Sequence, residues 1–280
     1  MLQASNKKSA DLIIFSYDRP MQLYALLESI EKHVVGLNKV NVIYRSSDNK
    51  FESGYEIVKR EFPETNYVKQ NNAPYDFMNI FGSTFKNIET EYFLLSVDDI
   101  IVTDSIDVED CIKNLDEIGA YGFFLRLGLN ITENYTVDQK CDLPPLQEVK
   151  PGVFYWKFSE GSGDWGLAIS TDMTVYRKKD FEKFVFNTRY IAPNDMEQRW
   201  TAPKDDFGIC YEHSKIINIP LNVVQLNKWH RSMNLCFPAE LLEKFLTGSK
   251  IDISKFHKID NKSPHIECIP KFVDLVLTVS

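Results

Sequence analysis

The sequence has no long apolar run and no excess of basic charge. No stretch approaches the ~20 apolar residues that a membrane-spanning helix needs, and the first nine residues lack the apolar core of a signal peptide. The formal net charge of −8 argues against nonspecific binding to nucleic acid or anionic membranes, because both require a basic surface. We therefore expect a cytoplasmic protein with no membrane span and no nucleic-acid partner.

Cysteine pairs and glycine-rich motifs are also missing. The five cysteines are widely spaced and none form a Cys-x-x-Cys pair, so we expect reduced thiols rather than disulfides or a zinc site. No glycine-rich phosphate loop or dinucleotide fingerprint is present, which counts against P-loop chemistry and nicotinamide cofactors. The remaining composition, 44% hydrophobic and 26% charged, is typical of a globular protein.

Short apolar segments alternate with amphipathic segments along the first half of the chain. This alternation predicts an α/β fold with a mostly parallel sheet covered on both faces. The expected strands are 11–16, 39–45, 66–69 and 92–97, and the expected helices are 20–30, 54–62 and 74–88.

The second half continues less regularly, and residues 130–151 are expected to be mostly loop. The expected strands there are 120–127, 153–158 and 216–224, and the expected helices are 108–118, 179–186 and 238–246, with a further helix beginning near Pro193. No repeat or low-complexity linker separates the halves. We therefore expect one domain over residues 1–280.

Two adjacent carboxylates, Asp98 and Asp99, follow the apolar run 92–97. A buried, unpaired carboxylate is costly, so a pair at a strand end must face solvent, hydrogen-bond donors or a cation. Carboxylate oxygens suit Mg²⁺ or Mn²⁺, which bind proteins through one or two carboxylates together with substrate phosphates. The alternative is a solvated turn without chemistry.

Polar residues also follow the first two expected strands. In a parallel sheet, the loops at the carboxyl ends of the strands line the ligand-binding crevice. We therefore expect these residues to share one crevice with the carboxylate pair and to hold a base, a ribose or a phosphate. They are Ser16, Tyr17, Asp18, Arg19, Ser47 and Asp48.

In these motifs the chain resembles the GT-A glycosyltransferases, in particular bacterial members related to family 2. The segment 15–20 with Gln22 and Leu23 is similar to their first strand and base-binding loop. Residues 96–99 stand where that family carries a metal-binding Asp-x-Asp, although Val97 replaces its first acid. Residues 161–166 resemble the family's glycine loop, and 194–197 its acidic motif.

The resemblance implies a GT-A fold with a nucleotide-sugar-binding half (about 11–127) and an acceptor-binding half with a C-terminal extension (about 128–280). It also implies Mn²⁺ or Mg²⁺ as cofactor, held by Asp99 with Asp98 and by a late histidine, either His230 or His265. Lys262 and His265 would donate to the diphosphate.

The acidic motif of this resemblance supplies a general base, either Asp195 or Glu197, and of the two we favour Asp195. Two acids that lie two residues apart cannot share one helix face, so at most one points into the site. Simpler roles remain for several of these residues. Asp195 suits a helix cap, His230 suits surface packing, and Trp165 is placed equally well in the core or against an acceptor sugar.

The expected function is transfer of a hexosyl group from a nucleoside diphosphate sugar, of UDP or GDP type, to a saccharide or other hydroxyl acceptor. The resemblance implies an inverting, metal-dependent reaction in the synthesis of bacterial surface polysaccharides or glycoconjugates. Two alternatives remain. An inactive, glycosyltransferase-like binding protein would fit the incomplete Asp-x-Asp. A nucleotidyltransferase would use a similar sheet, but its glycine-rich, basic phosphate loop is missing.

Overall fold

The computed structural model describes residues 8–201, 203, 205–222, 224 and 235–276. The helices are α1 (Pro20–His33), α2 (Asn49–Glu61), α3 (Phe77–Lys86), α4 (Val108–Ile118), α5 (Lys178–Asn187), α6 (Pro193–Arg199) and α7 (Pro238–Leu246). The longer strands are β1 (Ala10–Tyr17), β3 (Leu37–Arg45), β4 (Asn66–Lys69), β5 (Tyr92–Val97), β11 (Gln147–Lys150), β12 (Val153–Lys157), β13 (Thr174–Arg177) and β14 (Phe207–Tyr211). The shorter strands are β2 (Val34–Val35), β6 (Ile100–Val102), β7 (Ile106–Asp107), β8 (Gly122–Phe124), β9 (Glu133–Asn134), β10 (Gln139–Lys140), β15 (Ile216–Asn218), β16 (Ser249–Ile251) and β17 (Phe272–Asp274).

One nine-stranded sheet, in the order β11-β12-β14-β8-β13-β5-β1-β3-β4, runs through the molecule. The strands β12 and β13 are each antiparallel to both of their neighbours. The remaining strands therefore share one direction, and β4, β3, β1 and β5 form a continuous parallel block. The predicted α/β class is confirmed, with a mixed, mostly parallel sheet flanked by helices.

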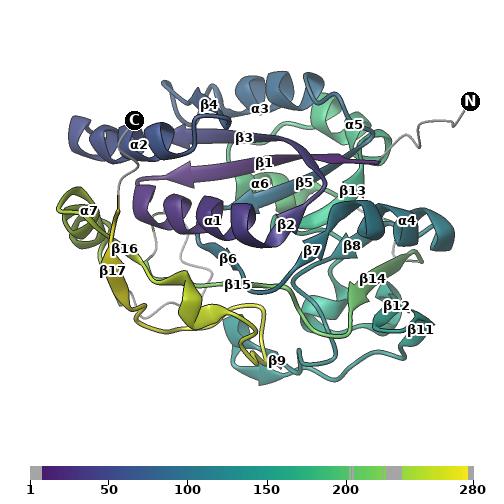
Figure 1. Cartoon of the computed structure of the whole chain (residues 1–280). Coiled ribbons are helices and arrows are strands. Elements are labelled where there is room, and N and C mark those ends of the chain that lie inside the picture. Colours follow the sequence, from purple (N-terminus) through teal and green to yellow (C-terminus); the bar gives the residue numbers. More distant parts are fainter. Residues whose placement is uncertain (1–7, 202, 204, 223, 225–234, 277–280) are drawn as a thin grey trace, which may run out of the picture.

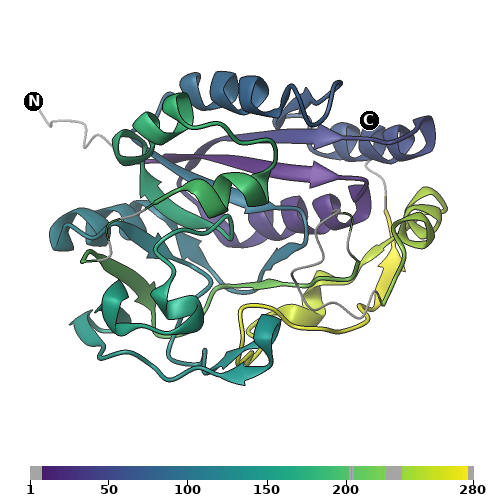
Figure 2. The same cartoon turned by 180° about the vertical axis from the view of Figure 1, so that it is seen from behind.

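Helices cover both faces of this sheet, as Figures 1 and 2 show from opposite sides. Successive residues of a strand point to opposite faces, and β1 shows the result. Leu12 and Ile14 pack into the core under α1, whereas Ile13 and Phe15 pack into a second core with the phenylalanines of α3 and α5. Because both faces are apolar, the polar groups of β1 can reach a ligand only at its ends.

Most of the predicted elements are confirmed, with three informative differences. Helix α2 begins at Asn49 instead of residue 54, because the Asp48 carboxylate accepts the free backbone N–H groups of its first turn. The expected strand 216–224 ends at Asn218, where β15 pairs with β6. Strands β13 and β14 were not predicted, although both lie beside β8 inside the sheet.

Gly208 explains why strand β14 is difficult to predict from the sequence. A Cβ at Gly208 would lie 2.5 Å from the ring of Trp156, so only glycine fits against the buried indole. Glycine normally counts against a strand. Here it marks a close approach between β14 and the side chain of β12.

The C-terminal segment returns to the first half of the chain. It runs from α7 past β16 and on to β17 (yellow in Figure 1). Helix α7 packs on α1 and α2, and the ring of Phe245 lies 5.6 Å from that of Tyr24. Among the described residues, no helix is both long and apolar enough to cross a membrane.

Candidate active site

The turn between β5 and β6 carries the carboxylate pair, and the carboxylate of Asp98 points back to β1. Its Oδ2 accepts a hydrogen bond from the Ser16 hydroxyl at 2.8 Å and from the backbone N–H of Tyr17 at 3.2 Å. Asp98 is only 3% exposed. Burial raises its pKa, and the neighbouring Arg19 guanidinium opposes that rise. The parallel pairing of β1 with β5 therefore brings the two predicted strand ends together.

Arg19 supplies the cation between the two carboxylates. Its Nη1 lies 3.0 Å from Asp98 Oδ1 and 3.0 Å from Asp99 Oδ2, and the residue is itself buried. Its Nε donates to the side-chain oxygen of Asn222 at 2.8 Å, and its Nη2 donates to the backbone carbonyl of Asn222. A buried ion pair stabilises the fold only when further hydrogen bonds satisfy both partners. Asn222 meets this condition for Arg19.

Tyr55 of α2 lies behind this group and is fully buried. Its hydroxyl is 2.7 Å from Ser16 Oγ and accepts the backbone N–H of Arg19 at 3.3 Å. Burial raises the pKa of Tyr55 well above its ordinary value, so the hydroxyl stays protonated. Because Ser16 gives its own proton to Asp98, Tyr55 donates to Ser16.

The other side of Asp99 faces the second half of the chain. Within the described part of the molecule, its Oδ1 is buried and has no hydrogen-bond partner. Burial raises the pKa of Asp99, Asp172 acts in the same direction, and Arg19 and His265 act against it. His265 Nε2 lies 3.9 Å from Asp172 Oδ2. Three segments that are distant in sequence therefore place an acid, a second acid and an imidazole together.

A second group of charges surrounds Glu197 of α6. Its Oε1 accepts the backbone N–H of Thr171 at 2.8 Å. Burial and, to a smaller extent, Asp172 raise the pKa of Glu197, the Thr171 N–H and Arg126 lower it, and the net result is a pKa of about 7. A carboxyl group with a pKa near 7 is suited to proton transfer at neutral pH.

Asp195, two residues earlier on the same helix, makes different contacts. Its Oδ1 pairs with Arg199 Nε at 2.6 Å, one helical turn later. Its Oδ2 accepts the backbone N–H of Ile191 at 3.0 Å. Asp195 thus stabilises the start of α6 and the preceding turn, whereas Glu197 faces the charged group with Arg126 and Asp172.

The glycine loop 161–166 is fixed by buried contacts. Asp164 pairs with the guanidinium of Arg126 at 2.5 Å, and both residues are buried. Trp165 is fully buried, stacks edge-on with Trp156 and donates its indole N–H to Ile131. Of the two roles considered for Trp165, the structure shows the core role.

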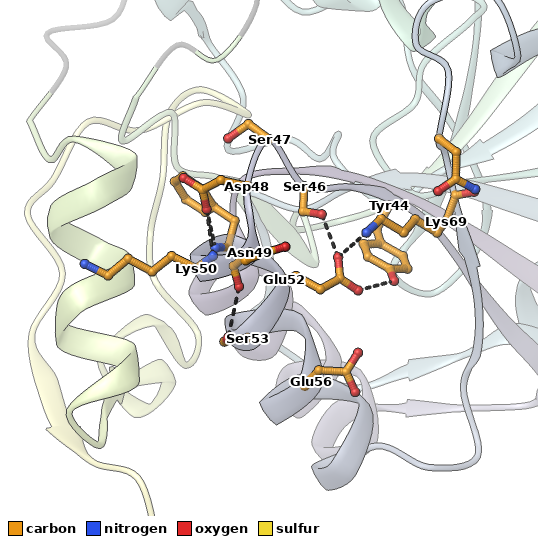
Figure 3. Close-up of polar contacts among 12 residues, drawn as sticks. Tyr44, Ser46, Ser47, Asp48, Asn49, Lys50, Glu52, Ser53, Glu56 and Lys69 are labelled. Carbon is orange, nitrogen blue, oxygen red and sulfur yellow. Dashed lines mark hydrogen bonds and ion pairs between the residues drawn. The ribbon is translucent and has the colours of Figure 1, made fainter.

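The polar residues after β3 lie beside the first loop, and Figure 3 shows part of this region. Asp18 accepts the backbone N–H of Ser47 at 2.8 Å. The Asp48 carboxylate turns to α2 and accepts the N–H groups of Lys50 and Phe51. Asp48 therefore caps α2 through its Oδ1, while Asp18 joins the two strand ends.

The remaining candidates are less closely tied to the carboxylates. Lys262 is exposed, and its backbone carbonyl accepts the N–H groups of Thr132 and Glu133. His230 lies outside the described residues. Among those that are described, no three histidine, cysteine or acidic side chains already stand at metal-binding distances.

Sequence reasoning missed several residues that complete the site. No spacing pattern in the sequence signals them, because each reaches the site through tertiary packing. They are Tyr55, Arg126, Thr171, Asp172 and Asn222.

Comparisons with known proteins give one relative by sequence. No family model matches the chain. A stretch of 191 residues is 28% identical to the bifunctional glycosyltransferase pgtA of Dictyostelium discoideum, and the match covers 62% of this chain and 24% of that protein. The chain thus spans about a quarter of this relative.

Solved structures give weaker likenesses. They include S. aureus TarS, with a TM-score of 0.46, 13% identity and coverage of 67% of this chain and 32% of that chain. A TarS structure in complex with UDP-GlcNAc has a TM-score of 0.43, 12% identity and coverage of 73% and 59%. The 4-diphosphocytidyl-2C-methyl-D-erythritolsynthase of Anaerococcus prevotii has a TM-score of 0.41, 10% identity and coverage of 80% and 93%.

With TM-scores below 0.5, the structural likenesses carry no argument about activity. The sequence match is independent of them and includes more than half of the chain. It confirms the predicted resemblance to the glycosyltransferases.

Proposed function

We propose that this protein is a glycosyltransferase that moves a sugar from a nucleoside diphosphate donor to a hydroxyl group of an acceptor, with inversion at the anomeric carbon. The observation that carries the proposal is the meeting of Asp98, Asp99, Arg19 and Tyr17 at the carboxyl edge of the parallel strands. This edge is where α/β sheets bind nucleotides. The sequence match to a glycosyltransferase supports the same activity.

The donor set at Asp99 fits a divalent cation. Its buried Oδ1 lacks a hydrogen bond among the described residues, and a carboxylate oxygen is a preferred ligand of Mg²⁺ and Mn²⁺. We propose that Asp99 and His265 hold the ion. When bound, such an ion offsets the negative charge that grows on the departing diphosphate. Asp98 takes the supporting role, because both of its oxygens are already used by Ser16, Tyr17 and Arg19.

Glu197 is the group that we propose as the general base, in place of Asp195. Attack by an acceptor hydroxyl requires a carboxylate that takes its proton, and the best base has a pKa near the working pH. Glu197 has a pKa of about 7, raised mainly by burial. Asp195 is paired with Arg199 and bonded to the Ile191 N–H, and both contacts turn it away from the acid–base cluster.

The proposal is tested by measuring donor binding and turnover together. Thermal unfolding is followed with UDP, GDP and their sugar conjugates, with and without Mn²⁺, and diphosphate release is measured with water as the acceptor. We expect one diphosphate to raise the melting temperature only with Mn²⁺, and Asp99→Asn to abolish both this response and the turnover. Glu91→Gln, an exposed change at the opposite end of β5, serves as the control.

Three outcomes contradict the proposal. Retained turnover in Asp99→Asn removes the metal role of this residue. Transfer of a nucleotidyl group from a nucleoside triphosphate to a sugar phosphate identifies a nucleotidyltransferase instead. Lack of any response to nucleotides leaves a glycosyltransferase-like protein without activity.

A further inference from the structure

The outer surface of α3 and α5 exposes large apolar side chains. The two helices cover the same face of the sheet (Figure 2) and pack together through buried phenylalanines, so that the rings of Phe85 and Phe181 lie 5.5 Å apart. On the outside of this layer, four apolar side chains face solvent. We call them the α3–α5 patch. They are Met78, Phe186, Ile191 and Tyr75, which are 36%, 50%, 57% and 80% exposed.

Close contacts join these side chains into one surface. A Cβ at Gly82 would lie 3.7 Å from the ring of Phe186, so α5 places this ring over the middle of α3. Met78 lies one helical turn before Gly82, on the same side of the helix. The rings of Phe77 and Tyr190 are 6.1 Å apart, which joins the start of α3 to the loop after α5. These two segments carry the other two side chains of the patch.

Basic residues surround the α3–α5 patch. Lys86 lies on α3, one turn beyond the contact with Phe186. Lys179 and Lys183 precede Phe186 on the same face of α5, and Arg189 follows this helix. All four basic residues are exposed. Among the described residues, none of these four cations has a carboxylate within ion-pair distance.

The two helices carry little negative charge to neutralise these cations. Helix α3 has no acidic residue, and α5 has Asp180 and Glu182. Asp180 lies 3.9 Å from the guanidinium of Arg177, so its charge is opposed by a separate base. The surface around the patch is therefore basic, although the whole chain has a formal net charge of −8.

The composition of this surface favours an anionic lipid bilayer over a protein partner. An exposed apolar patch marks a contact with either a protein or a membrane. Lysine is depleted in protein–protein interfaces. Surfaces that lie on membranes instead combine aromatic or aliphatic side chains, which enter the boundary between headgroups and acyl chains, with lysine and arginine, which face the anionic headgroups.

We propose that the α3–α5 patch docks on the surface of an anionic lipid bilayer. Phe186 and Met78 enter the headgroup region, and Lys86, Lys179 and Lys183 contact the charged headgroups. The acidic remainder of the molecule is repelled by the same bilayer, so docking through this face fixes the orientation of the protein. The inference goes beyond the proposed function and is independent of it, because docking requires neither a nucleotide nor turnover.

Vesicle co-sedimentation tests the docking. The vesicles contain phosphatidylcholine alone or phosphatidylcholine mixed with phosphatidylserine. We expect the wild-type protein to bind the mixed vesicles far more tightly, and this binding to weaken as salt is added. Lys179→Gln/Lys183→Gln is expected to lower the partition coefficient about 25-fold, or about 5-fold for each charge. Phe186→Ser is expected to lower it about 10-fold, because a phenylalanine ring no longer leaves water.

Matched control variants change the same residue types elsewhere. Lys140→Gln/Lys271→Gln removes two exposed lysines outside the patch, and Val137→Ser removes an exposed apolar side chain. Val137 lies beside the hairpin of β9 and β10, on the far side of the molecule from α3 (Figure 1). Both controls are expected to leave the partition coefficient close to that of the wild-type protein. Thermal unfolding of each variant verifies that the protein is folded.

Several results would overturn the proposal. One is a lack of binding of the wild-type protein to the mixed vesicles at low salt, and another is equally tight binding to phosphatidylcholine alone. A third is an equal loss in the control and the patch variants, which would mean that no particular face docks. A dimer in sedimentation equilibrium that Phe186→Ser dissociates, without vesicle binding, would assign the patch to a second copy of this chain.

Discussion

Two groups of acids at the same edge of the sheet are held in different ways. On the side of the parallel block, Asp98 uses both oxygens in bonds to a cation, a hydroxyl and a backbone amide. On the other side, Glu197 accepts a bond from Thr171, and burial raises its pKa to about 7. Burial raises the pKa of both carboxyl groups, to about 6 for Asp98 and to about 7 for Glu197, and the direct ion pair with Arg19 opposes the rise at Asp98. The difference teaches that the first group is held in an ion pair, as a fixed charge near neutral pH, whereas the second is placed to exchange a proton.

The largest expected effect tests the acid–base side. Glu197→Gln cannot take up a proton and is expected to lower kcat for transfer by about 10²- to 10⁴-fold, the usual contribution of a general base. Asp195→Asn is expected to lower kcat by less than about 10-fold, because it disturbs only the pairing with Arg199. Steady-state kinetics measure both. A larger loss of kcat in Asp195→Asn than in Glu197→Gln would identify Asp195 as the general base.

The raised pKa of Glu197 predicts that activity and stability change in opposite directions as pH rises. With a pKa near 7, the group becomes a competent base only as pH rises through about 7, so kcat should rise there. Its folded-state pKa lies above the ordinary 4.5, so the unfolded chain loses this proton first. Stability relative to Glu197→Gln should therefore fall as pH rises from near 4.5 to about 7. A difference in stability between the wild-type protein and Glu197→Gln that does not change with pH would contradict the raised pKa of Glu197.

The next effect tests the fixed-charge side. Arg19→Met leaves Asp98 and Asp99 buried without their cation, and loss of one partner of a buried ion pair costs about 3–5 kcal/mol. Urea denaturation should show this loss, with Arg60→Met within about 0.5 kcal/mol of the wild-type protein. Arg19→Lys should recover part of it. If Arg19→Met lowers the free energy of unfolding by less than about 1 kcal/mol, the carboxyl groups of Asp98 and Asp99 are hydrated or protonated in the folded protein.

The smallest expected effect tests whether Asp48 has a purely structural role, unlike the neighbouring acids of the site. Asp48→Ala removes the cap of α2 and should cost about 1 kcal/mol in the free energy of unfolding. Asp48→Asn should restore most of it, because asparagine caps equally well. Neither variant should change nucleotide affinity. A changed affinity with unchanged stability would return Asp48 to the list of ligand contacts.

Sequence periodicity was sufficient for the parallel block of the fold. The alternation of apolar runs and amphipathic helices predicted β1, α1, β4 and β5 nearly as the structure has them. It failed at β14, where Gly208 accommodates the indole of Trp156. Close contacts between side chains that are distant in sequence have no periodic signature.

The same division holds in the site. Ser16, Tyr17, Arg19, Asp98 and Asp99 were expected together, because carboxyl ends of parallel strands meet at one edge. The partners of these residues were not predictable. Residues such as Asn222 and Asp172 approach along segments whose paths depend on the packing of the whole chain. Local pattern therefore located the crevice but not all of the groups that line it.

The hydrogen bonds between Arg19 and Asn222 join residues 203 positions apart. At synthesis rates of about 5–20 residues per second, Asn222 leaves the ribosome about 10 to 40 s after Arg19. During that interval the arginine and its two aspartates lack this clamp, and the nascent parallel block exposes the faces that later elements cover. Nucleotide affinity should therefore develop only after Asn222 has been synthesised.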